Sequence, residues 1–136
     1  MEPEAASLSL KLAAEPQNVR QARDEAATYA EGLGLSAAGV DDLKTIVSEA
    51  CSNIVRHAYP ADATERPMEV EMEKTDGELT VTVRDSGSGI RPPTGARPNS
   101  LRLGFILMGS LADFLQLRTG RDRGTELLLR VPLASA

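Results

Sequence analysis

Two short motifs contain the residues of this chain that could do chemistry. Glu49 and Asn53 lie four positions apart in a stretch with helical periodicity, so their side chains project from the same side of a helix. Asp85 ends an alternating stretch typical of a β-strand and is followed by Gly87 and Gly89. Together, an acid and an amide on a helix and a carboxylate with glycines at a strand end indicate a nucleotide site.

Each of these residue types suits a particular task at such a site. The amide oxygen of Asn53 is a neutral hard ligand for Mg²⁺, which usually keeps water and phosphate oxygens as its other ligands. The carboxylate of Glu49 could serve as a general base. Asp85 can accept a hydrogen bond from an exocyclic amine such as that of adenine, and Gly87 and Gly89 could approach the ring closely and adopt positive φ.

Simpler interpretations stay open for the same residues. Glu49 and Asn53 could belong to the solvated face of an amphipathic helix, and Asp85 could be a turn residue that closes a strand. The row formed by Glu49, Asn53 and His57 adjoins the apolar stripe of its helix, which favours the edge of a groove over a solvated face. His57 is the only histidine, and we expect it to be structural, so no Ser-His-Asp set is supported.

Cys51 and Gly124-Thr125 carry weaker signals. Cys51 is the only cysteine, so it can form neither an internal disulfide nor a thiolate metal site. It lies in an apolar helical row and is predicted to be a small buried core residue. Gly124-Thr125 alone predicts no more than a hairpin.

The periodicity predicts a strand, two helices, two strands, a long loop, a helix and two strands. Pro16 and Ser36, or Asp41 in place of Ser36, are the candidate helix starts, and Asp76-Gly77 is the candidate hairpin turn. This order predicts an α+β fold, with a mixed, mostly antiparallel sheet covered on one face by helices. The expected ranges are strands 7–12, 68–73, 79–84, 114–118 and 125–131, helices 16–30, 36–58 and 103–113, and a loop 86–100.

Composition narrows the class of protein. A length of 136 residues predicts a single domain, 1–136, and 3% aromatic residues predict an aliphatic core. The net charge of −5 argues against nucleic acid as a direct partner, because a duplex binder needs clustered Lys and Arg. The N-terminus has no signal-peptide pattern and no apolar run is long enough for a membrane helix, so we expect a cytoplasmic protein with no membrane partner.

The order of these motifs resembles the anti-sigma factor serine/threonine protein kinases, a family within the gyrase-, chaperone- and histidine-kinase-type ATP-binding domains. The resemblance covers nearly the whole chain, and its most specific part is the helix motif extended through His57-Ala58-Tyr59. The segments that carry it are Glu49-Ala50-Cys51-Ser52-Asn53-Ile54-Val55-Arg56-His57-Ala58-Tyr59, Asp85-Ser86-Gly87-Ser88-Gly89, Leu103-Gly104-Phe105-Ile106-Leu107-Met108 and Gly124-Thr125.

The resemblance implies a two-layer α/β sandwich that holds ATP and Mg²⁺ between its helices and a lid at about 86–102. It also implies a protein that sequesters a sigma factor, phosphorylates a serine or threonine of a STAS-type anti-anti-sigma antagonist, and forms a homodimer. The implied roles are Mg²⁺ coordination by Asn53, general-base catalysis by Glu49, binding of the adenine amine by Asp85, shaping of that pocket by Gly87 and Gly89, support of the adenine contact by Thr125, and a lid hinge at Gly104.

The chain departs from the family pattern in the lid. Leu101 and Arg102 occupy positions where the family usually has a glycine-rich run, and a backbone that wraps a triphosphate forms more easily with glycine. Arg102 could pair with phosphate or could fill the site. The alternative function is therefore a non-catalytic partner-switching protein with weak or no ATP binding. The ATP-binding part of a sensor histidine kinase is a third reading, disfavoured because no earlier helix carries a phospho-acceptor histidine.

Overall fold

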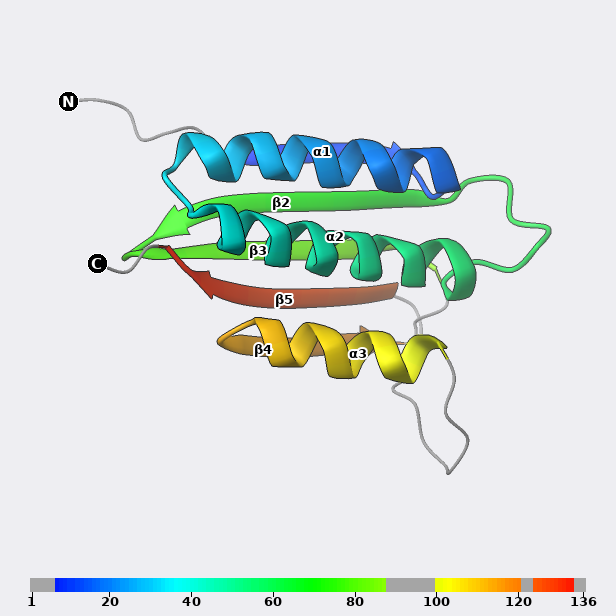
Figure 1. Cartoon of the computed structure of the whole chain (residues 1–136). Coiled ribbons are helices and arrows are strands. Elements are labelled where there is room, and N and C mark those ends of the chain that lie inside the picture. The colour runs from blue at the N-terminus through cyan, green and yellow to red at the C-terminus, as the bar shows by residue number, and fades with distance from the viewer. Residues whose placement is uncertain (1–6, 88–99, 121–123, 134–136) are drawn as a thin grey trace.

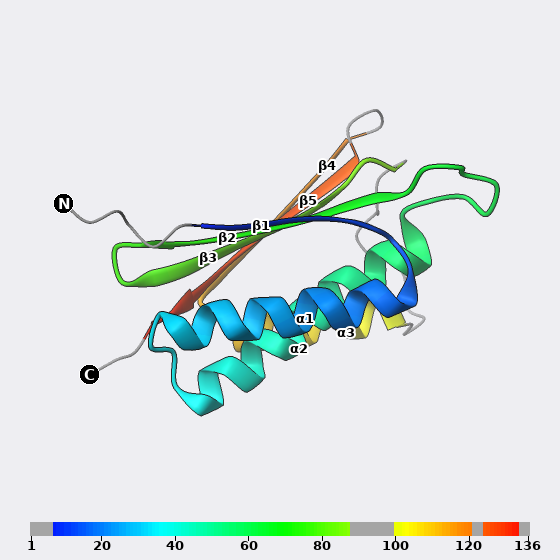
Figure 2. The same cartoon turned by 90° about the horizontal axis from the view of Figure 1, so that it is seen from above.

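Three helices cover one face of a five-stranded sheet and form a two-layer molecule (Figures 1 and 2). The computed structural model describes residues 7–87, 100–120 and 124–133, and only the backbone of 100–105 and 119–120. The helices are α1 (Pro16–Gly32), α2 (Ala37–His57) and α3 (Ser100–Leu111), and the strands are β1 (Leu8–Ala13), β2 (Pro67–Thr75), β3 (Glu78–Asp85), β4 (Phe114–Gly120) and β5 (Gly124–Pro132).

The sheet has the strand order β1-β2-β3-β5-β4, and all four neighbouring pairs are antiparallel. This confirms the predicted α+β class, with one correction, because the sheet contains no parallel pair among the strands described and so is not mixed. Asp85 pairs with Met68 at one end of the sheet, while Glu78 pairs with Pro132 at the other. Leu133 then donates its amide to the Gly77 carbonyl, 3.0 Å away, at that second end.

Local sequence explains where the first two helices begin and end. Pro16 occupies the first turn of α1, where its missing N–H costs nothing. The Ser36 hydroxyl accepts a hydrogen bond from the Gly39 amide at 3.1 Å, so Ser36 rather than Asp41 caps α2. The last residue of α2 is His57, because Pro60 follows within three positions and cannot continue a helix.

The third helix is displaced from its predicted range of 103–113. It begins at Ser100, so the backbone of Leu101 and Arg102 is helical, and both are good helix formers. It ends at Leu111 because the backbone then turns into the sheet, where the Asp113 amide donates to the Arg130 carbonyl at 2.8 Å.

The core between the two layers is aliphatic, as the composition predicts. Alternate residues of β2 and β3 point toward the helices and are almost fully buried. Small alanines on the buried side of α1 let that helix pack closely beside α2. Cys51 has no exposed surface, and burial raises the pKa of its thiol to about 12, which confirms it as a core residue. The central side chains are Leu43, Ile46, Val47, Met68, Val70, Met72, Leu79, Val81 and Leu129.

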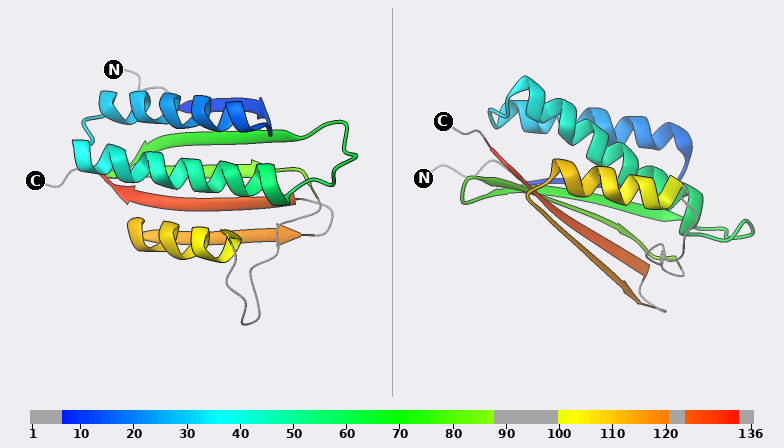
Figure 3. Two further views of the ribbon diagram at one scale, coloured as in Figure 1. Left: turned by 45° about the vertical axis from the view of Figure 1, so that its right-hand side comes forward. Right: turned by 60° about the horizontal axis from the view of Figure 1, so that its bottom comes forward.

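The helices leave the opposite face of the sheet uncovered (Figure 3, right). Arg84 lies on that face and contacts Glu126, Glu71 and Glu69 at 2.8, 3.1 and 3.5 Å. Arg84 and Glu126 are cross-strand partners of β3 and β5, and the residues that follow Arg84 and precede Glu126 are Asp85 and Thr125. The ion pair therefore holds the two strands in register beside those residues.

Candidate functional site

A small cavity lies between α2 and the ends of the central strands. Its volume is about 20 Å³, which is close to one water-sized sphere. The structure thus brings three of the predicted site residues, Asn53, Asp85 and Thr125, to one place. The lining consists of Ala50, Asn53 and Ile54 from α2, Val83 and Asp85 from β3, Leu117 from β4, and Thr125 and Leu127 from β5.

The Asp85 carboxylate is held by one oxygen and presents the other. Its Oδ1 accepts hydrogen bonds from the Gly87 amide at 2.9 Å and from the Thr125 amide at 3.3 Å. Its Oδ2 is buried and has no hydrogen-bond partner within the described part of the chain. A buried acceptor without a partner is costly, so this oxygen is available to a donor that enters the cavity.

Burial raises the pKa of Asp85 above its ordinary value of 3.8, and the two amide hydrogen bonds oppose that rise. Because the folded-state pKa is higher than the unfolded one, the stability that Asp85 contributes is fully present below pH 3.8 and is lost as the pH rises through the folded pKa. We therefore expect wild type to lose stability relative to Asp85→Asn over that interval. Urea unfolding of both proteins across a pH series measures this, and a constant difference would contradict it.

Asn53 is even more unusual in its surroundings. The side chain is only 2% exposed, and neither its Oδ1 nor its Nδ2 has a hydrogen-bond partner among the residues described. Burying an amide without partners costs about 1–3 kcal/mol on protein mutational scales. A cost of this kind at a cavity wall is typical of a residue kept for binding rather than for stability.

Replacing Asn53 by leucine is expected to raise the free energy of unfolding without ligand by about 1–3 kcal/mol, because the unpartnered amide is removed. The matched control is Asn18→Leu, since the Asn18 amide donates to the Ala13 carbonyl at 2.8 Å and its loss should not stabilise the protein. Urea denaturation measures both effects. Equal destabilisation by the two substitutions would show that Asn53 has ordinary partners.

Glu49 lies one turn before Asn53 on α2 and is partly exposed. It does not line the cavity, and no hydrogen bond or ion pair to another described residue holds its carboxylate. The carboxylate is thus free to act on a group that lies outside the cavity, on the same side of α2.

Gly87 is required for a reason other than the predicted one. A Cβ at this position would lie 2.0 Å from the Ala58 carbonyl oxygen, so no side chain fits where the chain leaves β3 and passes the end of α2. The described glycines with positive φ are Gly34, Gly77 and Gly124, and Gly87 is not among them. The expected positive φ at Gly87 is therefore wrong, and Gly89 lies outside the described residues.

Gly124 is a site residue that the sequence analysis missed. It has φ of +74°, and a Cβ would lie 2.1 Å from the Asp85 carbonyl oxygen and 2.9 Å from Oδ1. Only glycine lets the start of β5 approach Asp85 closely enough for the Thr125 amide to reach its carboxylate. The signal was Gly124-Thr125, which alone indicated a hairpin, while the resemblance gave a role to Thr125 but none to Gly124.

Arg102 and Gly104 both lie in α3, which packs beside α2. Gly104 is the fifth residue of that helix, so it lies within a helix rather than in a loop. The hinge role of Gly104 and the phosphate role of Arg102 stay predictions.

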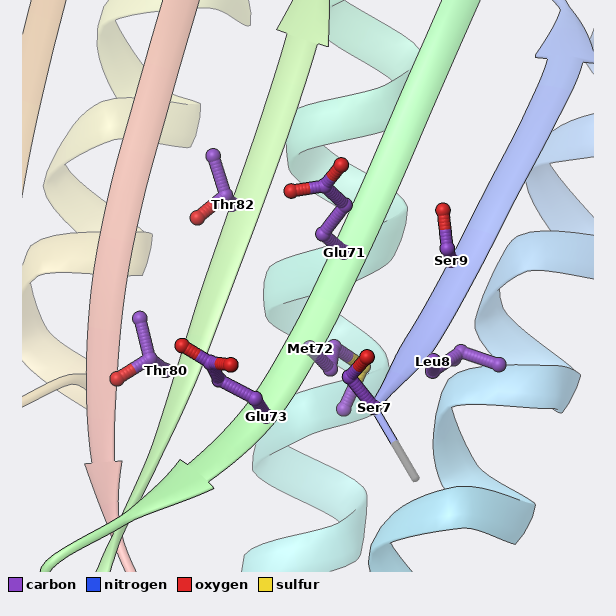
Figure 4. Close-up of a pocket in the computed structure, with 8 residues that line it drawn as sticks. All are labelled: Ser7, Leu8, Ser9, Glu71, Met72, Glu73, Thr80 and Thr82. Atoms are coloured by element: carbon purple, nitrogen blue, oxygen red, sulfur yellow. The ribbon is translucent and has the colours of Figure 1, made fainter. Parts of the chain in front are cut away.

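A larger hollow of about 280 Å³ lies on the uncovered face of the sheet (Figure 4). Glu71 and Glu73 of β2 and Thr80 and Thr82 of β3 border it, and Ser9 of β1 faces them. One of these carboxylates, that of Glu71, is paired with Arg84 at 3.1 Å. None of the described residues that line this hollow has a buried polar side-chain atom without a hydrogen-bond partner, so the smaller cavity remains the candidate site.

The donor and acceptor set of the small cavity fits an adenine nucleotide with Mg²⁺. Asp85 Oδ2 can accept from the adenine amine, and Asn53 Oδ1 is a suitable Mg²⁺ ligand. The part of the chain that the structure describes has no cluster of three or more His, Cys, Asp or Glu side chains. A purine is several times larger than this cavity. The walls of the cavity would therefore have to separate for a purine ring to enter.

The fold places helices on one face of an antiparallel sheet, and Asn53 and Asp85 line one cavity beneath α2. These features are those of an ATP-binding domain family. The family model for the histidine kinase-like ATPase domain matches residues 12–131, and the chain belongs to this family. None of the described helices is long and apolar enough to span a membrane.

Relatives of similar length are anti-sigma F factors, in agreement with the resemblance seen in the motifs. The protein of Clostridium acetobutylicum is 30% identical in an alignment of 136 positions. The alignment covers 93% of this chain and 94% of the relative. That of Clostridium botulinum strain Eklund 17B is 29% identical over 132 residues, covering 90% and 92%.

Two solved structures share the fold. The structure of the RsbU and RsbW domains of Rv1364c from Mycobacterium tuberculosis matches with a TM-score of 0.75 at 20% identity, over 95% of this chain and 32% of that one. The histidine kinase domain of the blue-light activated histidine kinase from Erythrobacter litoralis EL346 matches with a TM-score of 0.60 at 20% identity, over 85% and 61%.

Proposed function

We propose that this protein is an anti-sigma factor that sequesters a sigma factor and releases it in a partner switch with a STAS-type antagonist. The match to anti-sigma F factors along more than nine-tenths of the chain supports this role. The switch uses ATP-dependent phosphorylation of a serine or threonine of the antagonist, and the protein acts as a cytoplasmic homodimer.

The observation that carries the nucleotide part is the convergence of two buried, unpartnered polar groups on one cavity. Asp85 Oδ2 accepts a hydrogen bond from the adenine amine, while Oδ1 stays fixed by the backbone amides of Gly87 and Thr125. Asn53 Oδ1 would be a ligand of Mg²⁺. Arg102 and Gly104 of α3 contribute to phosphate binding and to lid movement.

Mg-ATP supplies the phosphoryl group, and the protein supplies the base and the orientation. The hydroxyl oxygen of the antagonist forms the new P–O bond, the bond to the leaving ADP breaks, and Glu49 accepts the hydroxyl proton. Glu49 suits this task because it lies beside the metal ligand on α2 but outside the adenine cavity.

A second candidate function is partner switching without catalysis. It is favoured by the cavity volume of about 20 Å³ and by Leu101 and Arg102 in place of lid glycines. In that case the sigma factor is bound and released with no phosphate transfer.

Calorimetric titration with ATP and with purine riboside triphosphate, which lacks the 6-amino group, tests nucleotide binding, and phosphate transfer to the antagonist then separates the two functions. With Mg²⁺ we expect ATP to bind more tightly than the analogue, because only ATP donates to Asp85 Oδ2. Asp85→Asn should remove most of that preference, and Asn53→Ala should abolish the effect of Mg²⁺. Absence of ATP binding would support the second function, and equal affinities for the two nucleotides would contradict the role of Asp85.

A further inference from the structure

The hydroxyl of Tyr59 bridges two strands beside the candidate site. Tyr59 follows the end of α2, and its ring packs against the core. The hydroxyl accepts a hydrogen bond from the Ser86 amide at 2.8 Å and donates to the Pro67 carbonyl. It thereby connects the residue just after β3 to the first residue of β2.

This bridge joins two backbone groups just beyond the last cross-strand pair of β2 and β3. Met68 and Asp85 are the last cross-strand pair of β2 and β3, and the next residues outward are Pro67 and Ser86. Proline has no amide N–H, so Pro67 and Ser86 cannot exchange both hydrogen bonds of an ordinary antiparallel pair. The donor and acceptor that remain, the Ser86 amide and the Pro67 carbonyl, are joined through the Tyr59 hydroxyl. A phenol that donates and accepts at once serves both backbones.

The same segment also positions Gly87. A Cβ at Gly87 would lie 2.0 Å from the Ala58 carbonyl oxygen and 3.2 Å from the ring of Tyr59. The backbone from Asp85 to Gly87 is therefore fixed against Ala58 and Tyr59 on one side. On the other side, the Gly87 amide donates to Asp85 Oδ1 at 2.9 Å, so displacement of Ser86 would also move the group that orients the carboxylate.

We propose that Tyr59 is a positioning residue for base recognition, which holds Ser86 so that Asp85 directs its Oδ2 at the purine amine. This role rests on the proposed nucleotide site. Burial is the main cause that raises the pKa of Tyr59, which keeps the hydroxyl protonated and able to donate to Pro67. The effect of Tyr59 on binding passes through Asp85, because the Tyr59 hydroxyl itself is occupied by two backbone groups.

The test compares Tyr59→Phe with Tyr29→Phe. These are the only two tyrosines, and the Tyr29 hydroxyl is buried with no hydrogen-bond partner among the described residues, so its removal breaks no described contact. We expect Tyr59→Phe to weaken ATP binding about tenfold and to leave the affinity for purine riboside triphosphate unchanged. Tyr29→Phe should change neither affinity.

A purely structural role gives a different result. If Tyr59→Phe weakens the binding of ATP and of the analogue equally, so that the preference for ATP is intact, Tyr59 does not position Asp85. The comparison of the two nucleotides therefore distinguishes positioning from general destabilisation, which the thermal unfolding of both variants reports separately.

Hydrogen exchange at the Ser86 amide tests the bridge without nucleotide. In wild type this amide should be protected, and in Tyr59→Phe it should exchange faster, with no change in Tyr29→Phe. An unprotected Ser86 amide in folded wild type would overturn the proposal even if the variant failed to fold. A protected amide in a protein that binds no ATP would support the bridge and overturn only the proposed nucleotide function.

Discussion

Replacing Gly124 by alanine is expected to destabilise the protein by about 2–5 kcal/mol and to weaken ATP binding at least about tenfold. Two penalties combine at this position. The backbone has φ of +74°, which a side chain disfavours, and the new Cβ would overlap the Asp85 carbonyl oxygen at 2.1 Å. Relief of the overlap must move β5 away from Asp85, and the hydrogen bond from the Thr125 amide to the carboxylate is then lost.

Gly77→Ala is the matched control for this substitution. Gly77 has φ of +81° but nothing within 4 Å of the added Cβ, so it incurs only the backbone penalty of about 1–2 kcal/mol. Urea unfolding and ATP titration of both variants separate strain from overlap. Equal loss of stability in the two variants, with ATP binding intact in both, would mean that Gly124 has no special relation to Asp85.

Glu49→Gln is expected to reduce phosphate transfer to the STAS-type antagonist of the same organism by a factor of about 10²–10⁴, the usual contribution of a general base. ATP affinity should change little, because Glu49 does not line the cavity that contains Asn53 and Asp85. Stability should also persist, since the side chain is partly exposed. Labelled phosphate on the antagonist measures transfer, and calorimetry measures ATP binding.

Asp42→Asn provides the control for Glu49→Gln. It removes one carboxylate from the same helix but at a distance from Asn53, so transfer should continue at the wild-type rate. If both variants transfer phosphate as wild type does, Glu49 is not the base. If wild type binds ATP but transfers none, the protein binds nucleotide without acting as a kinase.

Most of the fold could be predicted from local patterns. The alternation in β2 and β3 identified the residues that face the helices, and Ser36 and Pro60 marked where α2 begins and ends. The start of α3 was misplaced by three residues because Leu101 and Arg102 were assigned to the loop, although both favour helix. Helix ends depend on where the chain must turn into the next strand, and sequence spacing indicates this weakly.

The candidate site could be predicted only in part. Asn53 and Asp85 were identified because their residue types and spacing are informative within short motifs. Gly124 and Tyr59 belonged to the quoted motifs but received no role, because their importance comes from contacts with Asp85 and Ser86, which are distant in the chain. A glycine at the start of a strand is usually a turn residue, and only the 2.1 Å between a Cβ added at Gly124 and the Asp85 carbonyl oxygen shows otherwise.

The direction of β5 determines where the protein can be labelled. This strand starts beside Asp85 and ends at the opposite edge of the molecule, where Leu133 contacts Gly77 (Figure 1). A fluorophore, affinity tag or immobilising anchor attached at that end of the sheet, for example at the exposed Asp76 next to Gly77, therefore lies about one strand length from the cavity. Surface-bound protein should keep the cavity accessible to nucleotide, which makes tethered formats suitable for screening small molecules against it.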